Sequence, residues 1–206
     1  PFRDIDESLI NLVGGKSAHL GEIANRLGVP IPPGFTITTH AYLRVVEKSG
    51  LGPLIEAAIE QLVCGDARTS EIVSGRLRDA TIPRDVRQAV NRAVGELDVR
   101  GRPLHLAVRS SALGEDEELS FAGQYSTVLQ VEKDGVLDAY RQVLASLYTA
   151  NAIAYRQACG LPADGLMAVA CMRMVDAAAA GVLYTVDPMH PDNDRMLLGV
   201  TSGLAA

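Results

Sequence analysis

The 206-residue sequence predicts an α+β fold, in which helices and strands occupy different stretches of the chain. Between Tyr42 and Leu97, apolar residues recur only at the spacing of amphipathic helices. After Arg100 the pattern changes to short apolar runs bounded by turn residues, which are typical of strands. These runs cover residues 104–108, 166–175 and 181–186.

The composition is typical of a globular protein that buries a core, with 48% hydrophobic and 21% charged residues. A net charge of −6 argues against nucleic acid or an anionic membrane as partner, and favours a small molecule. Cys64, Cys159 and Cys171 are too widely spaced to suggest a disulfide framework or a zinc site. The sequence has no leader pattern and no apolar run of membrane-spanning length, so we expect a cytoplasmic protein.

The first half of the chain alternates caps and helices. Ser17 is predicted to cap a helix that runs to about Leu27 and ends before Gly28. Three closely spaced prolines then exclude a helix and predict an extended connector into a strand at 36–38. Further helices are predicted to begin at Thr38 or Thr39, at Pro53, near Glu71 and at Pro83. The stretch from Leu51 to Leu97 is interpreted as a helical insertion, with solvated arginines at positions 76, 78, 84, 87 and 92.

The second half contains most of the predicted strands. A buried strand at 104–108 is predicted to carry Arg109 out of its far end. A strand from Tyr125 to Val131 and one long helix from about Gly135 to Ala158 follow, and residues 195–200 form one more strand. No capping or polar tail closes the chain, so we expect it to be a truncated piece of a longer protein. We predict three parts, residues 1–50, 51–100 and 101–206.

Gly14, Gly15 and Lys16 have the chemistry of a polyphosphate site. The glycines let the backbone approach a ligand, the lysine supplies a point charge, and a helix begins just afterwards. A P-loop is excluded because Ile10 stands where that motif needs its first glycine. The alternative for an isolated motif of this kind is a turn beside a solvated surface lysine.

Several motifs occur in a fixed order: GGKSAHLGE, VPIPPGFTITTHAY, AVRSSALGEDEELSFAGQYSTVLQV, SLYTANAIAYR, MRMV and GVLYTVDP. Together they resemble the N-terminal nucleotide-binding domain of the phosphoenolpyruvate synthase and pyruvate phosphate dikinase family, which includes rifampin phosphotransferase and the glucan water dikinases. The resemblance implies an ATP-grasp fold, in which ATP lies between two α+β lobes. It also implies phosphoryl transfer from ATP to a histidine on a separate swivelling domain, and from there to an acceptor, for which pyruvate is the default.

The resemblance also assigns roles to residues. Lys16, in the turn with Gly14 and Gly15, would contact the ATP phosphates, and Arg109 would reach the terminal phosphate groups. Gly123 and Thr127 match the loop and strand that close over the phosphates in the family. Met174 and Val175 match the segment that lies beside the adenine. Met172 stands where the family usually has glutamine, so hydrogen bonding near the base would be weaker or come from the backbone alone.

Other parts of the family pattern do not match this sequence. The acidic ligands for Mg²⁺ would lie beyond Ala206, so we expect no metal ligand in this chain. None of His19, His40, His105 and His190 has the Thr-Ser-His setting of the phosphate-carrying histidine. We therefore expect the swivelling domain and a pyruvate-binding domain elsewhere in the full-length protein.

Two alternatives remain. The chain could be a stand-alone nucleotide-binding module without catalysis, or the ATP-binding domain of a rifampin-type phosphotransferase. If a missing segment normally covers the ATP, this chain alone would expose an apolar groove and could form a homodimer.

Overall fold

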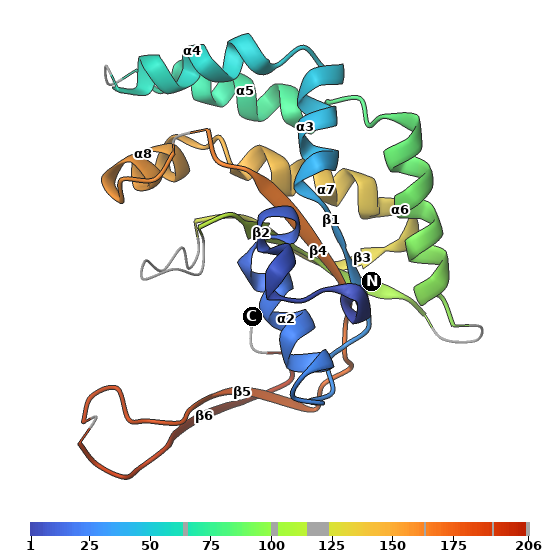
Figure 1. Cartoon of the computed structure of the whole chain (residues 1–206), viewed down its shortest axis with the longest axis vertical. Coiled ribbons are helices and arrows are strands. Elements are labelled where there is room, and N and C mark those ends of the chain that lie inside the picture. The colour runs from blue at the N-terminus through green and yellow to red at the C-terminus, as the bar shows by residue number, and fades with distance from the viewer. Residues whose placement is uncertain (64–65, 100–102, 115–123, 163, 191, 205–206) are drawn as a thin grey trace. The chain divides into compact units, whose positions relative to one another are not determined.

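The computed structural model describes the whole chain except residues 64–65, 100–102, 115–123, 163, 191 and 205–206 (Figure 1). The described residues form two compact units, Pro1–Met174 and Val175–Ala206. The first unit holds a four-stranded antiparallel sheet with helices, and the second holds a two-stranded antiparallel sheet. This combination of helices with antiparallel sheets confirms the predicted α+β class.

The elements of the first unit are as follows. The N-terminal helices are η1 (Phe2–Asp4), η2 (Glu7–Leu9), α1 (Ile10–Val13) and α2 (Gly15–Asn25). The later helices are α3 (Thr39–Lys48), α4 (Gly52–Val63), α5 (Arg68–Arg78), α6 (Arg84–Leu97), η3 (Lys133–Gly135), α7 (Val136–Ser146) and α8 (Ala150–Ala158). The strands are β1 (Gly34–Ile37), β2 (His105–Ala112), β3 (Thr127–Glu132) and β4 (Met167–Arg173).

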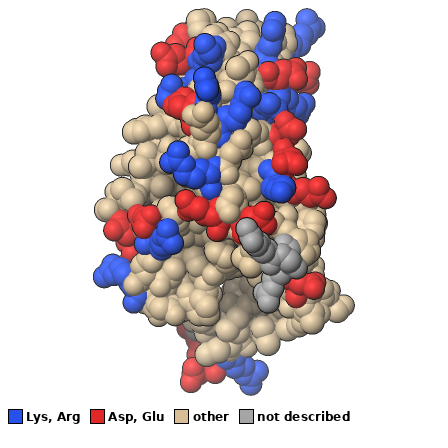
Figure 2. Space-filling view, turned by 90° about the vertical axis from the view of Figure 1, so that its right-hand side faces the viewer, with Lys and Arg blue, Asp and Glu red and all other residues tan. Residues whose placement is uncertain are grey.

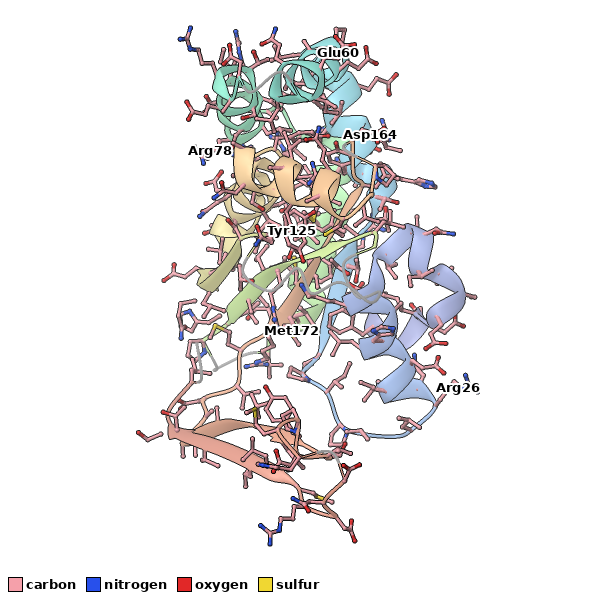
Figure 3. The ribbon with its side chains drawn as sticks, turned by 90° about the vertical axis from the view of Figure 1, so that its left-hand side faces the viewer. Arg26, Glu60, Arg78, Tyr125, Asp164 and Met172 are labelled. Carbon is pink, nitrogen blue, oxygen red and sulfur yellow. The ribbon has the colours of Figure 1, made fainter. Side chains whose placement is uncertain are left out.

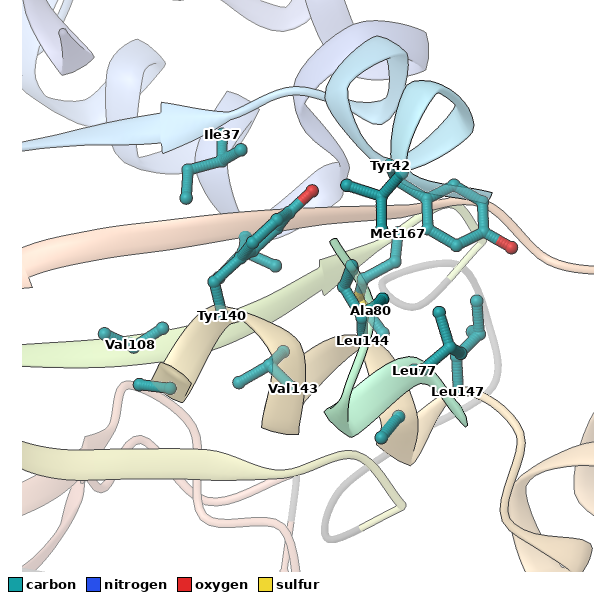
Figure 4. Close-up of a cluster of buried hydrophobic side chains, with 14 of the residues drawn as sticks. Ile37, Tyr42, Leu77, Ala80, Val108, Tyr140, Val143, Leu144, Leu147 and Met167 are labelled. Atoms are coloured by element: carbon teal, nitrogen blue, oxygen red, sulfur yellow. The ribbon is translucent and has the colours of Figure 1, made fainter. Parts of the chain in front are cut away.

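The sheet has the order β1-β4-β2-β3, and every neighbouring pair is antiparallel. Because side chains alternate along a strand, Val108 points to one face of the sheet and Arg109 to the other. The face of Val108 carries the larger core, in which Tyr140 and Leu144 of α7 pack with Val108 and Met167 (Figure 4). The opposite face is covered near β4 by the N-terminal helices, where Val13 and Ala18 cluster with Ala170.

The helices α3 to α6 add their buried side chains to the same core as the sheet. Their arginines at 76, 78, 84, 87 and 92 are exposed, which confirms the predicted solvated face. On the side of the molecule that Figure 2 shows, basic and acidic side chains are interspersed. None of the helices in the described ranges is long and apolar enough to cross a membrane.

The prediction of one helix over residues 135–158 was wrong, because the chain leaves the helical path between α7 and α8. Thr149 is extended and caps α8, accepting a hydrogen bond from the Ala152 amide at 3.2 Å. The buried Arg156 donates to the Leu147 carbonyl at 2.8 Å, so a contact from the following helix satisfies the backbone at the break. The apolar spacing runs through this break without interruption and could not reveal it.

The second unit is a hairpin of β5 (Ala179–Tyr184) and β6 (Leu197–Ser202). Its apolar side chains are exposed along both strands, at Val182, Leu183, Tyr184, Leu197, Leu198 and Val200. An isolated two-stranded hairpin is marginally stable in water, and exposed apolar patches commonly mark contact surfaces.

Candidate functional site

A pocket of about 300 Å³ lies on the sheet face that carries α2. Helix α2 contributes Lys16, His19, Leu20 and Ile23; strands β2 and β4 contribute Arg109, Ser110, Ala170 and Met172. The structure therefore brings Lys16, Arg109 and Met172 to one pocket from three elements. No residue of α4, α5 or α6 lines it, so the predicted helical insertion leaves the space between Lys16 and Arg109 open.

The sequence predicted that Arg109 follows the end of a strand. In the structure Arg109 lies inside β2. Strand β2 continues to Ala112 and pairs with β4 along its length. Arg109 is directly opposite Ala170 on one side and Thr127 on the other. Because opposite residues in an antiparallel sheet project to the same face, Thr127 lies on the face of the pocket, next to Arg109.

The segment that leads into β3 is held by two hydrogen bonds, one buried and one partly buried. The guanidinium of Arg156 donates to the Tyr125 hydroxyl at 3.1 Å, and Tyr125 is labelled in Figure 3. The Ser126 amide donates to the Ser146 hydroxyl at 3.0 Å. These contacts fix the backbone immediately before Thr127. Gly123, the predicted member of the closing loop, lies outside the described residues.

The turn at Gly14, Gly15 and Lys16 is built against strand β2. Gly14 has φ +74°, a backbone conformation that favours glycine, and directly precedes α2. A Cβ at Gly14 would lie 1.8 Å from the carbonyl oxygen of Ser111, so the turn has no room for a side chain. Gly15 is buried and begins α2, and Lys16 is half-buried.

The prediction that Ser17 caps this helix was wrong, because α2 already begins at Gly15 and Ser17 lies within it. The Ser17 amide donates a hydrogen bond to the side-chain hydroxyl of Ser111, at 3.0 Å. A residue distant in sequence thus supplies the cap that the local motif was expected to contain.

The predicted adenine segment spans the end of β4 and the residues after it. Met172 is half-buried and lines the pocket (Figure 3). The Met174 amide donates to the His105 carbonyl at 2.9 Å, and its sulfur accepts from the Gln130 amide at 3.0 Å. Val175 is exposed and is the first residue of the second unit.

Met174 also marks an irregular place in the sheet. The pairing of β2 with β3 shifts between Leu106 and Val108, and Gln130 adopts φ +58° there. Such bulges bend a strand and are common beside active sites. The contact between the Gln130 amide and the Met174 sulfur therefore ties this bulge to the end of β4.

His19 is the pocket residue that sequence reasoning missed. The sequence analysis assigned none of the four histidines a role in the site, because none has the Thr-Ser-His setting, but His19 lines the pocket with Lys16 and Arg109. The available signal was spacing, because residues three apart on a helix share a face. An imidazole N–H can donate to a phosphate oxygen, so His19 adds another hydrogen-bonding group to the wall.

The donor set of the pocket fits a polyphosphate and an apolar group. Lys16 and Arg109 supply cationic donors, while Leu20, Ile23 and Met172 supply apolar surface. None of the described residues that line it is a carboxylate. Across the described parts of the chain, no three His, Cys, Asp or Glu side chains gather into a possible metal site.

Comparison with known proteins shows which family this chain resembles. The family model for the pyruvate phosphate dikinase AMP/ATP-binding domain matches residues 10–206. A probable phosphoenolpyruvate synthase of Staphylothermus marinus is 35% identical over 98% of this chain and 25% of its own length. A rifampicin phosphotransferase of Streptomyces sviceus is 37% identical over 98% of this chain and 24% of its length. A phosphoenolpyruvate synthase of Neisseria meningitidis is 35% identical over 90% of this chain and 25% of its length. The chain spans about a quarter of the length of these relatives.

Proposed function

Because the chain belongs to the family of pyruvate phosphate dikinase AMP/ATP-binding domains, we propose that the pocket between α2 and β2 binds ATP through its phosphates. The observation that carries this proposal is that Lys16, Arg109 and Met172 line one pocket although they are far apart in sequence. An ATP-grasp arrangement, with ATP between two α+β lobes, is part of the proposal.

The chain's own residues supply positioning and positive charge. Lys16 is a compact point charge at the start of α2, and Arg109 presents a planar fork of donors from the middle of β2. Phosphoryl transfer depends chiefly on orienting the phosphates and neutralising charge on their oxygens. Arg109 would hold the terminal phosphate groups, and Lys16 with the backbone of Gly14 and Gly15 would hold the others.

Thr127 and the methionines complete the proposed site. The position of Thr127 opposite Arg109 puts a hydroxyl donor beside the guanidinium. Met172, with Met174 and Val175 after it, would lie along the base, and the thioether of Met172 offers apolar contact where a glutamine would offer hydrogen bonds. Gly123 would belong to the loop that closes over the phosphates.

Magnesium would enter with the nucleotide and would neutralise negative charge on its phosphate groups. Magnesium prefers oxygen ligands, especially carboxylates and phosphates. The described residues that line the pocket include no carboxylate, and we propose that the protein's magnesium ligands lie outside this chain.

For the full-length protein we propose an ATP-dependent dikinase or phosphotransferase of the phosphoenolpyruvate synthase type. The phosphoryl group would pass to a histidine on a separate swivelling domain, and finally to pyruvate on a pyruvate-binding domain. This chain would supply the ATP site alone and would be inactive without those domains.

A second candidate acceptor is rifampicin, because a phosphotransferase named for it is as similar to this chain as the synthases are. A third possibility is a nucleotide-binding module without catalysis. The retained cationic pair, Lys16 and Arg109, favours catalysis, because binding a base alone has no need of an arginine that reaches the terminal phosphate.

An ATP-consumption assay on the full-length protein distinguishes these functions. We expect consumption to rise when pyruvate is added and to fall with a Lys16→Ala variant that remains folded. A rise with rifampicin in place of pyruvate would identify the second candidate. Binding of Mg-ATP without consumption in the presence of either acceptor would identify the non-catalytic module.

A further inference from the structure

Ser111 connects the turn before α2 to strand β2. It is fully buried, and its hydroxyl makes two hydrogen bonds to backbone groups distant in sequence. The hydroxyl accepts from the Ser17 amide at 3.0 Å and donates to the Val13 carbonyl at 2.8 Å. One side chain therefore ties the end of α1 and the start of α2 to the sheet.

The backbone of Ser111 is part of the same contact. Its carbonyl oxygen occupies the place where a Cβ of Gly14 would be, so the two backbones touch directly. Val13 and Ala18 are themselves buried against Ala170 of β4. The connection is thus enclosed by apolar side chains, where a hydrogen bond is not weakened by competing water.

The position of Ser111 links the two cationic groups of the pocket. Lys16 directly precedes Ser17, and the Ser17 amide donates a hydrogen bond to the Ser111 hydroxyl. Arg109 lies two residues before Ser111 on β2. Residues two apart on a strand point to the same face, so Arg109 and Ser111 both face α2. The hydrogen bond from the Ser17 amide to the Ser111 hydroxyl therefore connects the backbone next to Lys16 with the strand that carries Arg109.

We propose that Ser111 is a positioning residue, whose hydroxyl fixes Lys16 relative to Arg109 so that both meet the phosphates of one nucleotide. The inference rests on the proposed ATP-binding function. It adds that the position of the turn at Gly14, Gly15 and Lys16 against β2 determines the affinity for ATP. A site that is already arranged before binding avoids the free-energy cost of ordering it on binding.

A double-mutant cycle on Mg-ATP affinity tests this in the full-length protein. Ser111→Ala leaves the Ser17 amide and the Val13 carbonyl without their partner and is expected to weaken binding about 5- to 10-fold. Lys16→Ala is expected to weaken it about 10- to 100-fold. If Ser111 acts through Lys16, adding Ser111→Ala to Lys16→Ala should change affinity by less than about 2-fold.

Ser74→Ala is the matched control. Ser74 is also a buried serine whose hydroxyl donates to a backbone carbonyl, that of Ala145 at 3.0 Å, but it lies on α5 and does not line the pocket. We expect this variant to lose stability without losing Mg-ATP affinity. Ser111→Thr, which keeps the hydroxyl on a β-branched side chain suited to a strand, should restore affinity to within about 3-fold of the parent. If Ser111→Ala does not fold, Ser111→Cys replaces it in the cycle, because a thiol fills the space but is a weak donor and acceptor.

The inference is overturned if the Ser111 variant binds Mg-ATP like the parent, or if its effect is equally large with and without Lys16. A general loss of folding would give the second result, since it would not depend on the lysine. Failure of the proposed function gives a different result: the parent does not bind Mg-ATP, or Lys16→Ala binds it as tightly as the parent.

Discussion

Arg109 and Thr127 lie opposite each other in the antiparallel pairing of β2 with β3. Their side chains therefore share the sheet face on which the pocket with Lys16 lies. The pairing brings together two residues whose proposed roles, contact with the terminal phosphate and closure over the phosphates, require proximity.

Replacing Thr127 by valine should weaken Mg-ATP binding about 5-fold, because it removes one hydroxyl donor and keeps the β-branched shape. Titration calorimetry measures the effect. Thr36→Val is the control, since Thr36 lies in the same row of the sheet, opposite Ala170, and its buried hydroxyl has no partner among the described residues. A Thr127→Val variant that binds as tightly as this control would remove Thr127 from the site.

Gly14→Ala should prevent folding of the turn or lower the free energy of unfolding by more than about 4 kcal/mol, as expected for an exceptional steric conflict. The reason is the 1.8 Å approach to the Ser111 carbonyl together with φ +74°. Gly28→Ala is the comparison, because Gly28 has φ +64° and nothing within 4 Å of the added Cβ. It should cost only about 1 kcal/mol of backbone strain. Urea unfolding of both variants checks this, and equal losses would contradict the close contact.

Alkaline pH should destabilise the first unit. Burial raises the pKa of the Cys171 thiol to about 12, and burial also raises the pKa of the Tyr42, Tyr140 and Tyr148 hydroxyls above the usual range. In the unfolded chain these groups ionise near pH 8.5 for cysteine and near pH 10 for tyrosine. Above those values the folded state binds more protons, so the free energy of unfolding falls as pH rises. The slope is at most about 1.4 kcal/mol per pH unit for each group.

Tyr140→Phe isolates one of these groups. The Tyr140 hydroxyl is buried and has no hydrogen-bond partner in the described structure, so its removal should cost little at pH 7. At pH 11 the variant should be more stable than the parent, because one ionisable group has been removed from the unfolded state. Tyr42→Phe should be destabilised already at pH 7, since the Tyr42 hydroxyl is bonded to that of Tyr148. Equal stability differences at pH 7 and 11 for Tyr140→Phe would contradict this account.

Because the apolar side chains of the β5–β6 hairpin are exposed, we expect this chain to associate with itself when it is studied alone. Leu183 and Leu198 are paired across β5 and β6, and are 54% and 63% exposed. Changing both to threonine keeps a strand-forming side chain and removes apolar surface. We expect the dimer fraction in sedimentation equilibrium to fall. Leu27→Thr, at a position 71% exposed outside the hairpin, should leave it unchanged. Dimers that persist in the double variant would place the contact elsewhere.

The sequence predicted those features that depend on local signals. The helix starts near Pro53 and Pro83 and the left-handed glycine at Gly28 follow from residue conformational preferences. The family resemblance implied that Lys16 and Arg109 both contact the ATP phosphates, and the structure brings the two residues to one pocket. The roles of these residues in binding ATP, and the division at residues 50 and 100, stay predictions.

The features it did not predict depend on tertiary contacts. Arg109, Ser110 and Ser111 look like the polar end of a strand, but the neighbouring helices and β4 bury both serines and β2 continues through them. Helix α2 is capped by Ser111, from the other half of the chain, and the break between α7 and α8 is satisfied by Arg156. Propensity and periodicity cannot report such partners, because they describe only neighbours in sequence.

Titration of the chain with Mg-ATP, beside Lys16→Ala, Arg109→Ala and Arg26→Ala, tests the central claim most directly. Arg26 is the control because it is an exposed arginine paired with Glu22, just beyond the end of α2, and does not line the pocket. The account predicts that the parent and Arg26→Ala bind alike, and that each of the other variants binds at least about 10-fold more weakly. Binding of equal strength by all four folded proteins would show that the nucleotide does not occupy this pocket.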